Sequence, residues 1–99
     1  MPRRYRVRLL PAAARTLEKV VPSVRHRVKT AIDRLEREPR PAGVKAVSGQ
    51  AGLLRIRVGD YRIIYRVVDD QLLVLVIRIG HRAEFFRAAA MRQVRRRAR

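Results

Sequence analysis

The pattern of hydrophobic and polar positions divides the first part of the chain into a short strand and two helices. Residues 5–9 alternate between hydrophobic and arginine side chains until Pro11, a period of two that predicts a strand with one buried face. Residues 12–20 are rich in helix-forming residues, which predicts a short helix that ends before Pro22. From Pro22 the apolar positions recur every three or four residues, so we expect a second, clearer amphipathic helix that stops before Pro39.

Strand patterns follow in the middle of the chain. Residues 40–52 contain several glycines and prolines and predict a loop. Residues 54–58 alternate again, and residues 61–68 form another β-rich run. The pair Gly59-Asp60 between them has the chemistry of a two-residue turn. These segments therefore predict a β-hairpin.

The rest of the chain predicts a buried strand and a final helix. Asp69-Asp70 forms a further turn, and residues 72–79 are almost entirely apolar. Such a run is typical of a strand covered on both faces, so we expect it in the centre of the sheet. Residues 83–99 return to helix-forming residues, with arginines gathered near the end. The predicted order of elements is β-α-α-β-β-β-α.

Composition and charge narrow the possible classes of protein. With 99 residues the chain has room for one core, so we expect a single domain over residues 1–99. Lysine plus arginine number 25 against 8 acidic residues, a net charge of +17, while 47% of the residues are hydrophobic. The hydrophobic content excludes a charged disordered tail. The charge favours a polyanionic partner, such as RNA, DNA, a ribosome, an anionic membrane or an acidic protein.

Several kinds of site are excluded by what the chain lacks. It has no cysteine, which excludes disulfides, thiol catalysis and zinc held by thiolates. Its histidines are His26 and His81, so we expect no histidine-rich metal site and no cofactor. The basic N-terminus is not followed by an unbroken apolar segment, and the apolar run at 72–77 is far shorter than the ~20 residues that span a bilayer. We therefore expect a cytoplasmic protein without a membrane partner.

Arginines on the predicted hairpin form the first candidate site. With a two-residue turn at Gly59-Asp60, Arg57 lies directly opposite Arg62, and Arg55 shares their face. Like charges opposed on a sheet repel, so a bound anion would explain the arrangement. The alternative is an ordinary solvated basic face in an arginine-rich protein.

The tripeptide Gly80-His81-Arg82 is the second candidate. It follows the buried strand, so we expect His81 and Arg82 beside Arg57 and Arg62. Imidazole exchanges protons near neutral pH. Beside phosphate-binding arginines it would act as acid or base in RNA cleavage, in which a 2′-hydroxyl attacks the adjacent phosphorus without a metal ion. The alternative is that the tripeptide is only a turn at the end of a strand.

A longer motif includes both candidates. Residues 54–65 read LRIRVGDYRIIY, and together with the acidic pair at 69–70 and the tripeptide at 80–82 they resemble the RelE/ParE superfamily of bacterial and archaeal toxins from type II toxin–antitoxin pairs. The resemblance implies an α+β fold in the order β-α-α-β-β-β-α. In that fold an N-terminal helical hairpin packs on a small, mostly antiparallel sheet, as in microbial ribonucleases.

The resemblance also implies an activity and site residues. In the RelE branch the toxin enters the ribosomal A site and cuts mRNA there without a metal ion or cofactor, leaving a cyclic phosphate and a 5′-hydroxyl. The matching arginines would bind phosphate and neutralise the transition state. The candidate catalytic residues are therefore Arg57, Arg62, His81 and Arg82, and the candidate RNA-binding residues are Arg55, Arg66 and Phe86.

Two departures from the family pattern leave other functions open. Many relatives carry a tyrosine where this chain has Phe86, which can stack on a base but has no hydroxyl to move a proton. An arginine also stands where RelE carries a lysine, and a guanidinium is a poor general base, which leaves His81 as the best proton acceptor. The alternatives are a ParE-like inhibitor of DNA gyrase without catalytic activity and an RNA-binding homologue that has lost cleavage.

The partners implied by the resemblance fit the charge of the chain. A cognate acidic antitoxin would wrap the toxin with an initially disordered C-terminal arm, cover the basic cluster and contact or displace the helix at 83–99. The ribosome and mRNA are the other expected partners. DNA would be contacted only indirectly, through the antitoxin.

Overall fold

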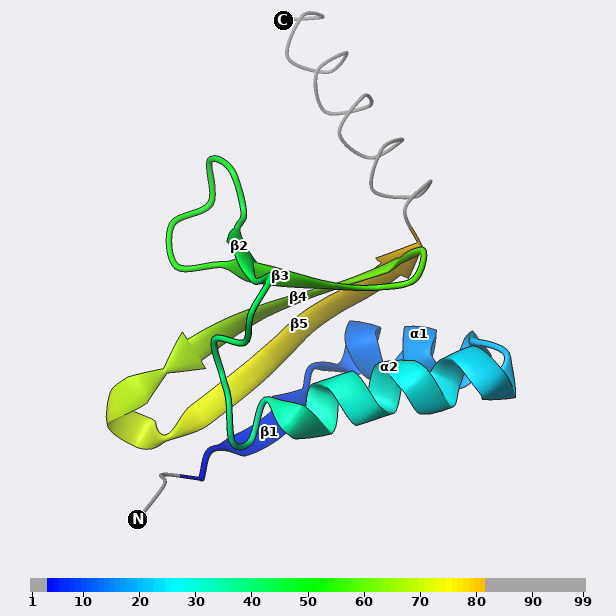
Figure 1. Cartoon of the computed structure of the whole chain (residues 1–99), viewed down its shortest axis with the longest axis horizontal. Coiled ribbons are helices and arrows are strands. Elements are labelled where there is room, and N and C mark those ends of the chain that lie inside the picture. Colours follow the sequence, from blue (N-terminus) through cyan, green and yellow to red (C-terminus); the bar gives the residue numbers. More distant parts are fainter. Residues whose placement is uncertain (1–3, 82–99) are drawn as a thin grey trace, which may run out of the picture.

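In the part of the chain that the structure describes, residues 4–81, five strands form one mixed sheet and two helices lie against one of its faces (Figure 1). The structure is a computed structural model. Its elements are β1 (Arg6–Leu9), α1 (Pro11–Lys19), α2 (Pro22–Arg34), β2 (Lys45–Ala46), β3 (Leu54–Val58), β4 (Tyr61–Val68), the 3-10 turn η1 (Asp69–Gln71) and β5 (Leu73–His81). The helix expected at 83–99, together with Arg82 and Phe86, lies outside the described residues.

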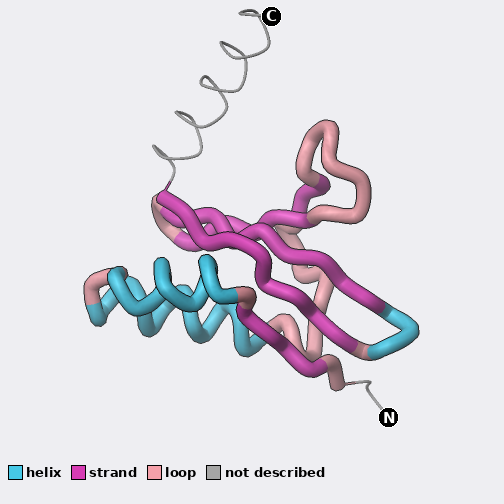
Figure 2. Tube along the Cα trace, turned by 180° about the vertical axis from the view of Figure 1, so that it is seen from behind, coloured by secondary structure: helices cyan, strands magenta, loops and turns pink. Residues whose placement is uncertain are grey.

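The sheet is mostly antiparallel. Its strand order is β1-β5-β4-β3-β2, in which β1 runs parallel to β5 and every other neighbouring pair is antiparallel. Figures 1 and 2, seen from opposite sides, both show α1 and α2 on the same side of the sheet. The expected α+β fold, with a helical hairpin on a mostly antiparallel sheet, is therefore confirmed.

The apolar strand β5 lies inside the sheet, as its sequence predicts. It pairs with β1 along one edge and with β4 along the other. Its two faces differ, however, because Val74 and Val76 are buried on the helix side whereas Leu73 and Leu75 on the opposite side are only partly buried. Within the described residues the helices form a layer on one side alone, so the expectation that both faces are covered stays a prediction.

The segment predicted as a loop at 40–52 contains a short strand. Lys45 and Ala46 of β2 pair with Arg55 and Leu54 of β3. The backbone N–H of Val47 also donates to the carbonyl of Leu53 at 2.9 Å, which closes the turn between the two strands. Two residues are too few to show an alternating pattern, so the strand is visible only once its partner is in place.

Hydrophobic residues from the helices and the sheet form the core between the two layers. Pro11 and Pro22 stand in the first turns of α1 and α2, where a helix does not need their missing N–H groups. The largest fully buried side chains are those of Tyr65, Leu35, Ile63, Ile79, Val28, Val74 and Val76. In the described range neither helix has the length and apolar character that crossing a membrane requires.

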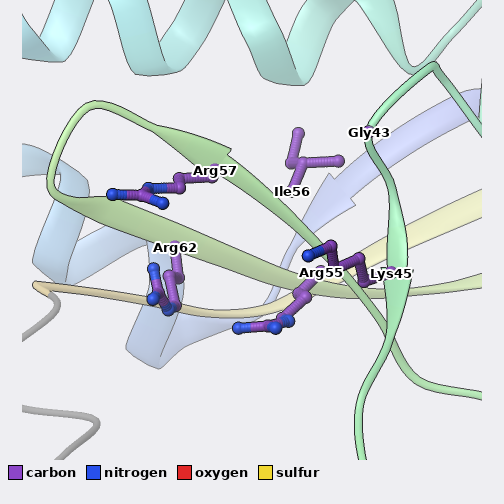
Figure 3. Close-up of a pocket in the computed structure, with 6 residues that line it drawn as sticks. All are labelled: Gly43, Lys45, Arg55, Ile56, Arg57 and Arg62. Atoms are coloured by element: carbon purple, nitrogen blue, oxygen red, sulfur yellow. The ribbon is translucent and has the colours of Figure 1, made fainter.

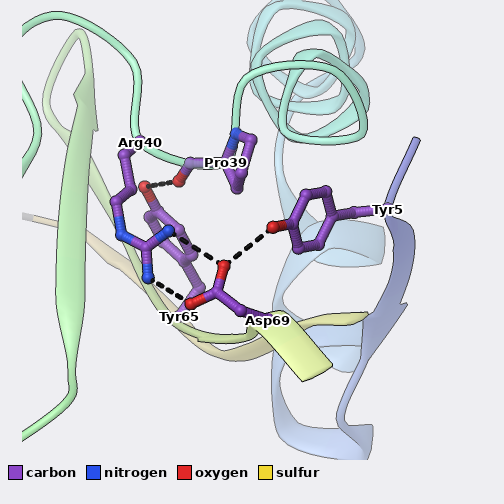
Figure 4. Close-up of polar contacts among 5 residues, drawn as sticks. All are labelled: Tyr5, Pro39, Arg40, Tyr65 and Asp69. Carbon is purple, nitrogen blue, oxygen red and sulfur yellow. Dashed lines mark hydrogen bonds and ion pairs between the residues drawn. The ribbon is translucent and has the colours of Figure 1, made fainter. Parts of the chain in front are cut away.

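A network of polar contacts joins the residue before β1, the segment after α2, strand β4 and the turn between β4 and β5 (Figure 4). The hydroxyl of Tyr5 donates to Oδ1 of Asp69 at 2.7 Å. Arg40 donates to both oxygens of the same carboxylate, from Nη1 at 3.1 Å and from Nη2 at 2.9 Å. The hydroxyl of Tyr65 donates to the carbonyl of Pro39 at 2.8 Å. We call these five residues the Asp69 network.

The Asp69 network also fixes protonation states. The hydrogen bonds that Arg40 donates to Asp69 are the main reason why the pKa of Arg40 is raised. Burial raises the pKa of Tyr65 to about 12, although the charge of Arg40 acts in the opposite direction. Tyr65 therefore keeps its donating proton in the folded state at a pH where a tyrosine in water has lost it.

Candidate nucleic-acid interface

The hairpin of β3 and β4 carries basic residues on the face that points away from the helices. Arg57 pairs with Arg62, as the two-residue turn predicts. Arg55 pairs with Ile64 on β4 and with Lys45 on β2. Cross-strand partners share a face, as do alternate residues of one strand. We call Lys45, Arg55, Arg57 and Arg62 the hairpin cluster.

The hairpin cluster lines a hollow of about 100 Å³ together with Gly43 and Ile56 (Figure 3). In Figure 3 the side chain of Ile56 points toward α2, whereas Arg55 and Arg62 extend from the other side of the hairpin. The described residues around this hollow offer guanidinium and ammonium groups but no carboxylate and no imidazole. Arginine and lysine stay protonated at neutral pH, so the hollow is suited to an anion such as phosphate.

A further cation reaches the turn of the hairpin from the helix layer. Nε of Arg57 donates to the carbonyl of Gly59 at 3.4 Å, which turns this side chain toward the end of the hairpin. Gly59 adopts a φ of 58°, the left-handed conformation that a tight two-residue turn needs. Nη2 of Arg27, on α2, lies 3.8 Å from the position that a Cβ on Gly59 would take. The basic surface therefore continues around the turn.

Arg66 extends the basic face in the other direction. It lies on β4 four residues after Arg62, so it shares the face of Arg62, and it is exposed. Its Nε lies 3.8 Å from the position that a Cβ on Gly52 would take, so the side chain reaches the turn between β2 and β3. The structure therefore brings Arg66 onto the face that carries the hairpin cluster, at its far end.

His81 is not brought together with Arg57 and Arg62, contrary to the sequence-based expectation. It pairs with Tyr61, whereas Arg62 pairs with Gly80, and neighbouring residues of a strand point to opposite faces. The rings of His81 and Tyr61 meet edge to face, with centroids 5.3 Å apart and planes at 89°. The expectation considered only that His81 ends a strand beside the hairpin and not which face the pairing would give it.

Sequence reasoning also missed two basic residues near the site. Lys45 lies in the unpredicted strand β2, and its place beside Arg55 depends on a turn that brings the two strands together. Arg27 belongs to the polar face of α2, and its approach to Gly59 depends on how the helix packs on the sheet. Within residues 4–81 no group of three or more histidine, cysteine, aspartate or glutamate residues is placed to hold a metal ion.

Comparison with known proteins gives a family match and a close relative. The family described as ParE toxin of type II toxin–antitoxin system, parDE, matches residues 7–86. The toxin RelG of Mycobacterium tuberculosis (strain ATCC 25618 / H37Rv) is 36% identical over 84 residues, which cover 84% of this chain and 97% of RelG. Both matches include most of the described sheet and the hairpin cluster.

Solved structures show the same architecture. A chain in the toxin–antitoxin complex RelBE2 from Mycobacterium tuberculosis superposes with a TM-score of 0.71 at 33% identity, covering 80% of this chain and 99% of that chain. A chain in the archaeal RelE–RelB complex from Pyrococcus horikoshii OT3 superposes with a TM-score of 0.70 at 29% identity, covering 83% of this chain and 97% of that chain. The similarity therefore spans nearly the whole of both relatives.

Proposed function

Because this chain belongs to the family of ParE toxins from type II toxin–antitoxin systems, within the RelE/ParE superfamily, we propose that it is a RelE-like toxin that cuts mRNA in the ribosomal A site. The observation that carries the proposal is the hairpin cluster, in which Arg57 and Arg62 are direct cross-strand partners on the face away from the helices. Opposed like charges repel, and a phosphate between them would relieve the repulsion, so the arrangement favours a polyanionic ligand.

The proposed reaction is the attack of an RNA 2′-hydroxyl on the adjacent phosphorus. The bond from O2′ to phosphorus forms while the bond from phosphorus to the 5′-oxygen of the next nucleotide breaks. One proton leaves the 2′-hydroxyl and another reaches the departing 5′-oxygen, giving a cyclic phosphate and a 5′-hydroxyl. Negative charge develops on the phosphoryl oxygens, where Arg57, Arg62 and, by resemblance, Arg82 would neutralise it. The other candidate residues, Arg55, Arg66 and Phe86, would hold the RNA.

The reaction needs a group that accepts the proton of the 2′-hydroxyl. Within the described residues His81 is our candidate for this role. It lies on the opposite face from Arg62, so it reaches the reacting phosphate only if the RNA passes around the end of the sheet where β5 ends. This path is part of the proposal, and His81→Ala tests it because cleavage should fall while RNA binding persists.

A second candidate function is inhibition of DNA gyrase by a ParE-like contact without catalysis. The family whose model matches this chain is described as ParE toxin of type II toxin–antitoxin system, parDE. The described lining of the hairpin cluster also contains no group that accepts a proton at neutral pH. In this alternative the cluster would be a binding surface only.

We propose that this chain binds a cognate antitoxin in the cell. The two solved relatives are toxin–antitoxin complexes, and this chain carries a net charge of +17. An acidic antitoxin arm would cover the hairpin cluster and compete with RNA for the same cations. The toxin should therefore bind RNA only after the antitoxin is removed from the complex.

The experiment that tests the proposed function adds the purified chain to translating ribosomes with a defined mRNA. New 5′ ends are mapped by primer extension, with naked mRNA and a gyrase supercoiling assay in parallel. Cuts in the A-site codon that require ribosomes support the proposal, and Arg62→Gln should abolish them while Lys29→Gln on the exposed side of α2 should not. Inhibited supercoiling without any cuts would contradict it and favour the gyrase alternative.

A further inference from the structure

The last residues of β3 have no strand beside them on one edge. β2 pairs only with the first two residues of β3, whereas β3 continues to Val58. Figure 3 shows β3 running past Gly43 toward the turn of the hairpin. Within residues 4–81 this edge of Ile56, Arg57 and Val58 therefore lacks a strand partner on the β2 side. We call these three residues the open edge.

The backbone of Arg57 points toward the side that lacks a strand. In an antiparallel pair, residues that exchange hydrogen bonds alternate with residues that do not. Val58 and Tyr61 flank the two-residue turn and exchange them, so the next pair, which includes Arg57, does not. The bond from Val47 to Leu53 gives the same alternation on the β2 side. The N–H and C=O of Arg57 therefore face outward, and neither has a backbone partner among the described residues.

Two hollows flank the open edge, one on each face of the sheet. The hollow of the hairpin cluster reaches Ile56 and Arg57. A second hollow of about 350 Å³ reaches all three residues of the open edge from the helix side. We call it the α2–β3 hollow. Its other described lining residues belong to α2 and the segment after it, and they are Ala31, Arg34, Glu38, Pro41, Ala42 and Gly43.

The two hollows differ in chemistry. The described lining of the hairpin cluster has cations and no carboxylate. The α2–β3 hollow has an apolar floor that includes Ala31, Ile56 and Val58. At its rim Arg34 and Glu38 carry opposite charges, and the carboxylate of Glu38 would repel an incoming acid. An extended segment beside β3 would direct alternate side chains to the two faces, so its acidic and apolar residues should alternate.

We propose that the open edge docks an extended segment of an acidic protein partner, in the order apolar–acidic–apolar. The central residue of this segment lies opposite Arg57, exchanges two backbone hydrogen bonds with it and places its carboxylate on the face of the Arg57 guanidinium. The two neighbouring side chains point into the α2–β3 hollow. The proposal rests on the proposed function only in that the cognate antitoxin would supply the segment. A second copy of this chain fits less well, because each copy carries a net charge of +17.

The first test measures the affinity of the purified full chain for two fluorescent peptides by anisotropy. Ser-Gly-Val-Glu-Val-Gly-Ser carries the proposed order once, and Ser-Gly-Glu-Val-Glu-Gly-Ser carries the reverse order with one more negative charge. The reversed peptide should bind at least about five-fold more weakly, because its two carboxylates meet the apolar hollow. If the first peptide does not bind, or if the reversed peptide binds as tightly, the inference is overturned.

Hydrogen exchange of single amides, measured by NMR, tests the backbone pairing directly. In the chain alone, the Arg57 amide should exchange faster than the Ile56 amide, which bonds across to β4. The first peptide should slow exchange at Arg57 by at least about ten-fold and change that of Ile56 by less than about two-fold. Unchanged exchange at Arg57 in the presence of saturating peptide would contradict the pairing.

A pair of variants tests the α2–β3 hollow without changing a charge. Ala42→Phe adds bulk at an exposed residue of the lining and should weaken binding of the first peptide about five-fold. Ala51→Phe, at an exposed position in the turn between β2 and β3, is the matched control and should bind the peptide like the unmodified chain. Equal affinities of the two variants would overturn the role of the hollow, and thermal unfolding checks that each variant folds.

These measurements are independent of RNA cleavage. If the chain cuts no mRNA but the first peptide slows exchange at Arg57, the proposed function fails and the docking edge stands. If the chain cuts mRNA and the peptide leaves Arg57 unchanged, the inference fails alone.

Discussion

The hairpin cluster and the Asp69 network use arginine in opposite ways. In the Asp69 network the guanidinium of Arg40 meets a carboxylate with two hydrogen bonds, and Tyr5 donates to the same carboxylate. In the hairpin cluster Arg57 and Arg62 face each other across two strands. The first arrangement joins opposite charges, whereas the second places like charges opposite each other, where a bound anion would relieve their repulsion.

This difference indicates that the Asp69 network stabilises the fold, whereas the hairpin cluster is suited to binding a ligand. The Asp69 network ties three segments that are distant in sequence, and its loss should lower stability without changing ligand binding. The hairpin cluster lies on the face of the sheet away from the helices, and its like charges repel, so its loss should change binding more than stability.

The largest expected effect comes from Arg62→Gln. If Arg62 neutralises charge in the transition state, cleavage of ribosome-bound mRNA should fall about 10²–10³-fold, measured by primer extension. The free energy of unfolding should change by less than about 1 kcal/mol, because the removal of one of two opposed charges offsets the contacts that the partly buried side chain loses. A loss of stability that accompanies the loss of cleavage would contradict the separation.

Asp69→Ala should have the largest effect on stability. It removes the acceptor of Arg40 and of the partly buried Tyr5 hydroxyl, so we expect the free energy of unfolding to fall by about 2 kcal/mol. Chemical denaturation measures this change. Asp70→Ala, at the exposed neighbouring position, is the matched control and should change stability by less than about 0.5 kcal/mol. RNA affinity should be the same in both variants.

Tyr65→Phe should have a smaller effect that depends on pH. It removes the hydrogen bond to the Pro39 carbonyl, which should cost about 1 kcal/mol at neutral pH. The pKa of Tyr65 is raised to about 12 in the folded state, so in the unmodified chain the unfolded state releases this proton first and stability falls as pH rises between about 10 and 12. Chemical denaturation between about pH 10 and 12 should show a weaker fall of the free energy of unfolding in the variant than in the unmodified chain. An identical fall in both would contradict the raised pKa of Tyr65.

Arg40→Gln should have the smallest effect of the series. The pair with Asp69 is about half exposed on both sides, with side-chain exposures of 51% and 53%, so solvent screens it. We expect a loss of about 0.5 kcal/mol that shrinks further at high salt. If Arg40→Gln destabilises as strongly as Asp69→Ala at all salt concentrations, the network depends on Arg40 more than its exposure indicates.

Local patterns were enough to predict every described helix and strand except β2, and the central pair of the candidate site. Alternation and a two-residue turn fixed the pairing of Arg57 with Arg62 because a hairpin register depends only on the turn between its strands. The helices and the central position of β5 followed from periodicity and apolar content. The resemblance to the RelE/ParE superfamily predicted the overall arrangement, which the sheet order and the similarity to solved structures confirm.

What could not be predicted depends on contacts between distant segments. The bond from Tyr5 to Asp69 joins residues 64 positions apart, and the turn pattern at 69–70 carries no sign of it. The face of His81 depends on the register between β4 and β5, which includes an irregularity between Ile64 and Tyr65.

The most direct test of the account is the salt dependence of binding to a short single-stranded RNA. The unmodified chain and Arg57→Gln/Arg62→Gln are compared across a range of salt concentrations, with Lys29→Gln/Arg37→Gln as the charge-matched control. We expect the cluster variant to bind the RNA at least ten-fold more weakly, and the slope of its affinity against salt concentration to fall by about two phosphate contacts. The control should stay close to the unmodified chain. Equal affinities and slopes for the cluster variant and the control would contradict the claim that the hairpin cluster is an anion site.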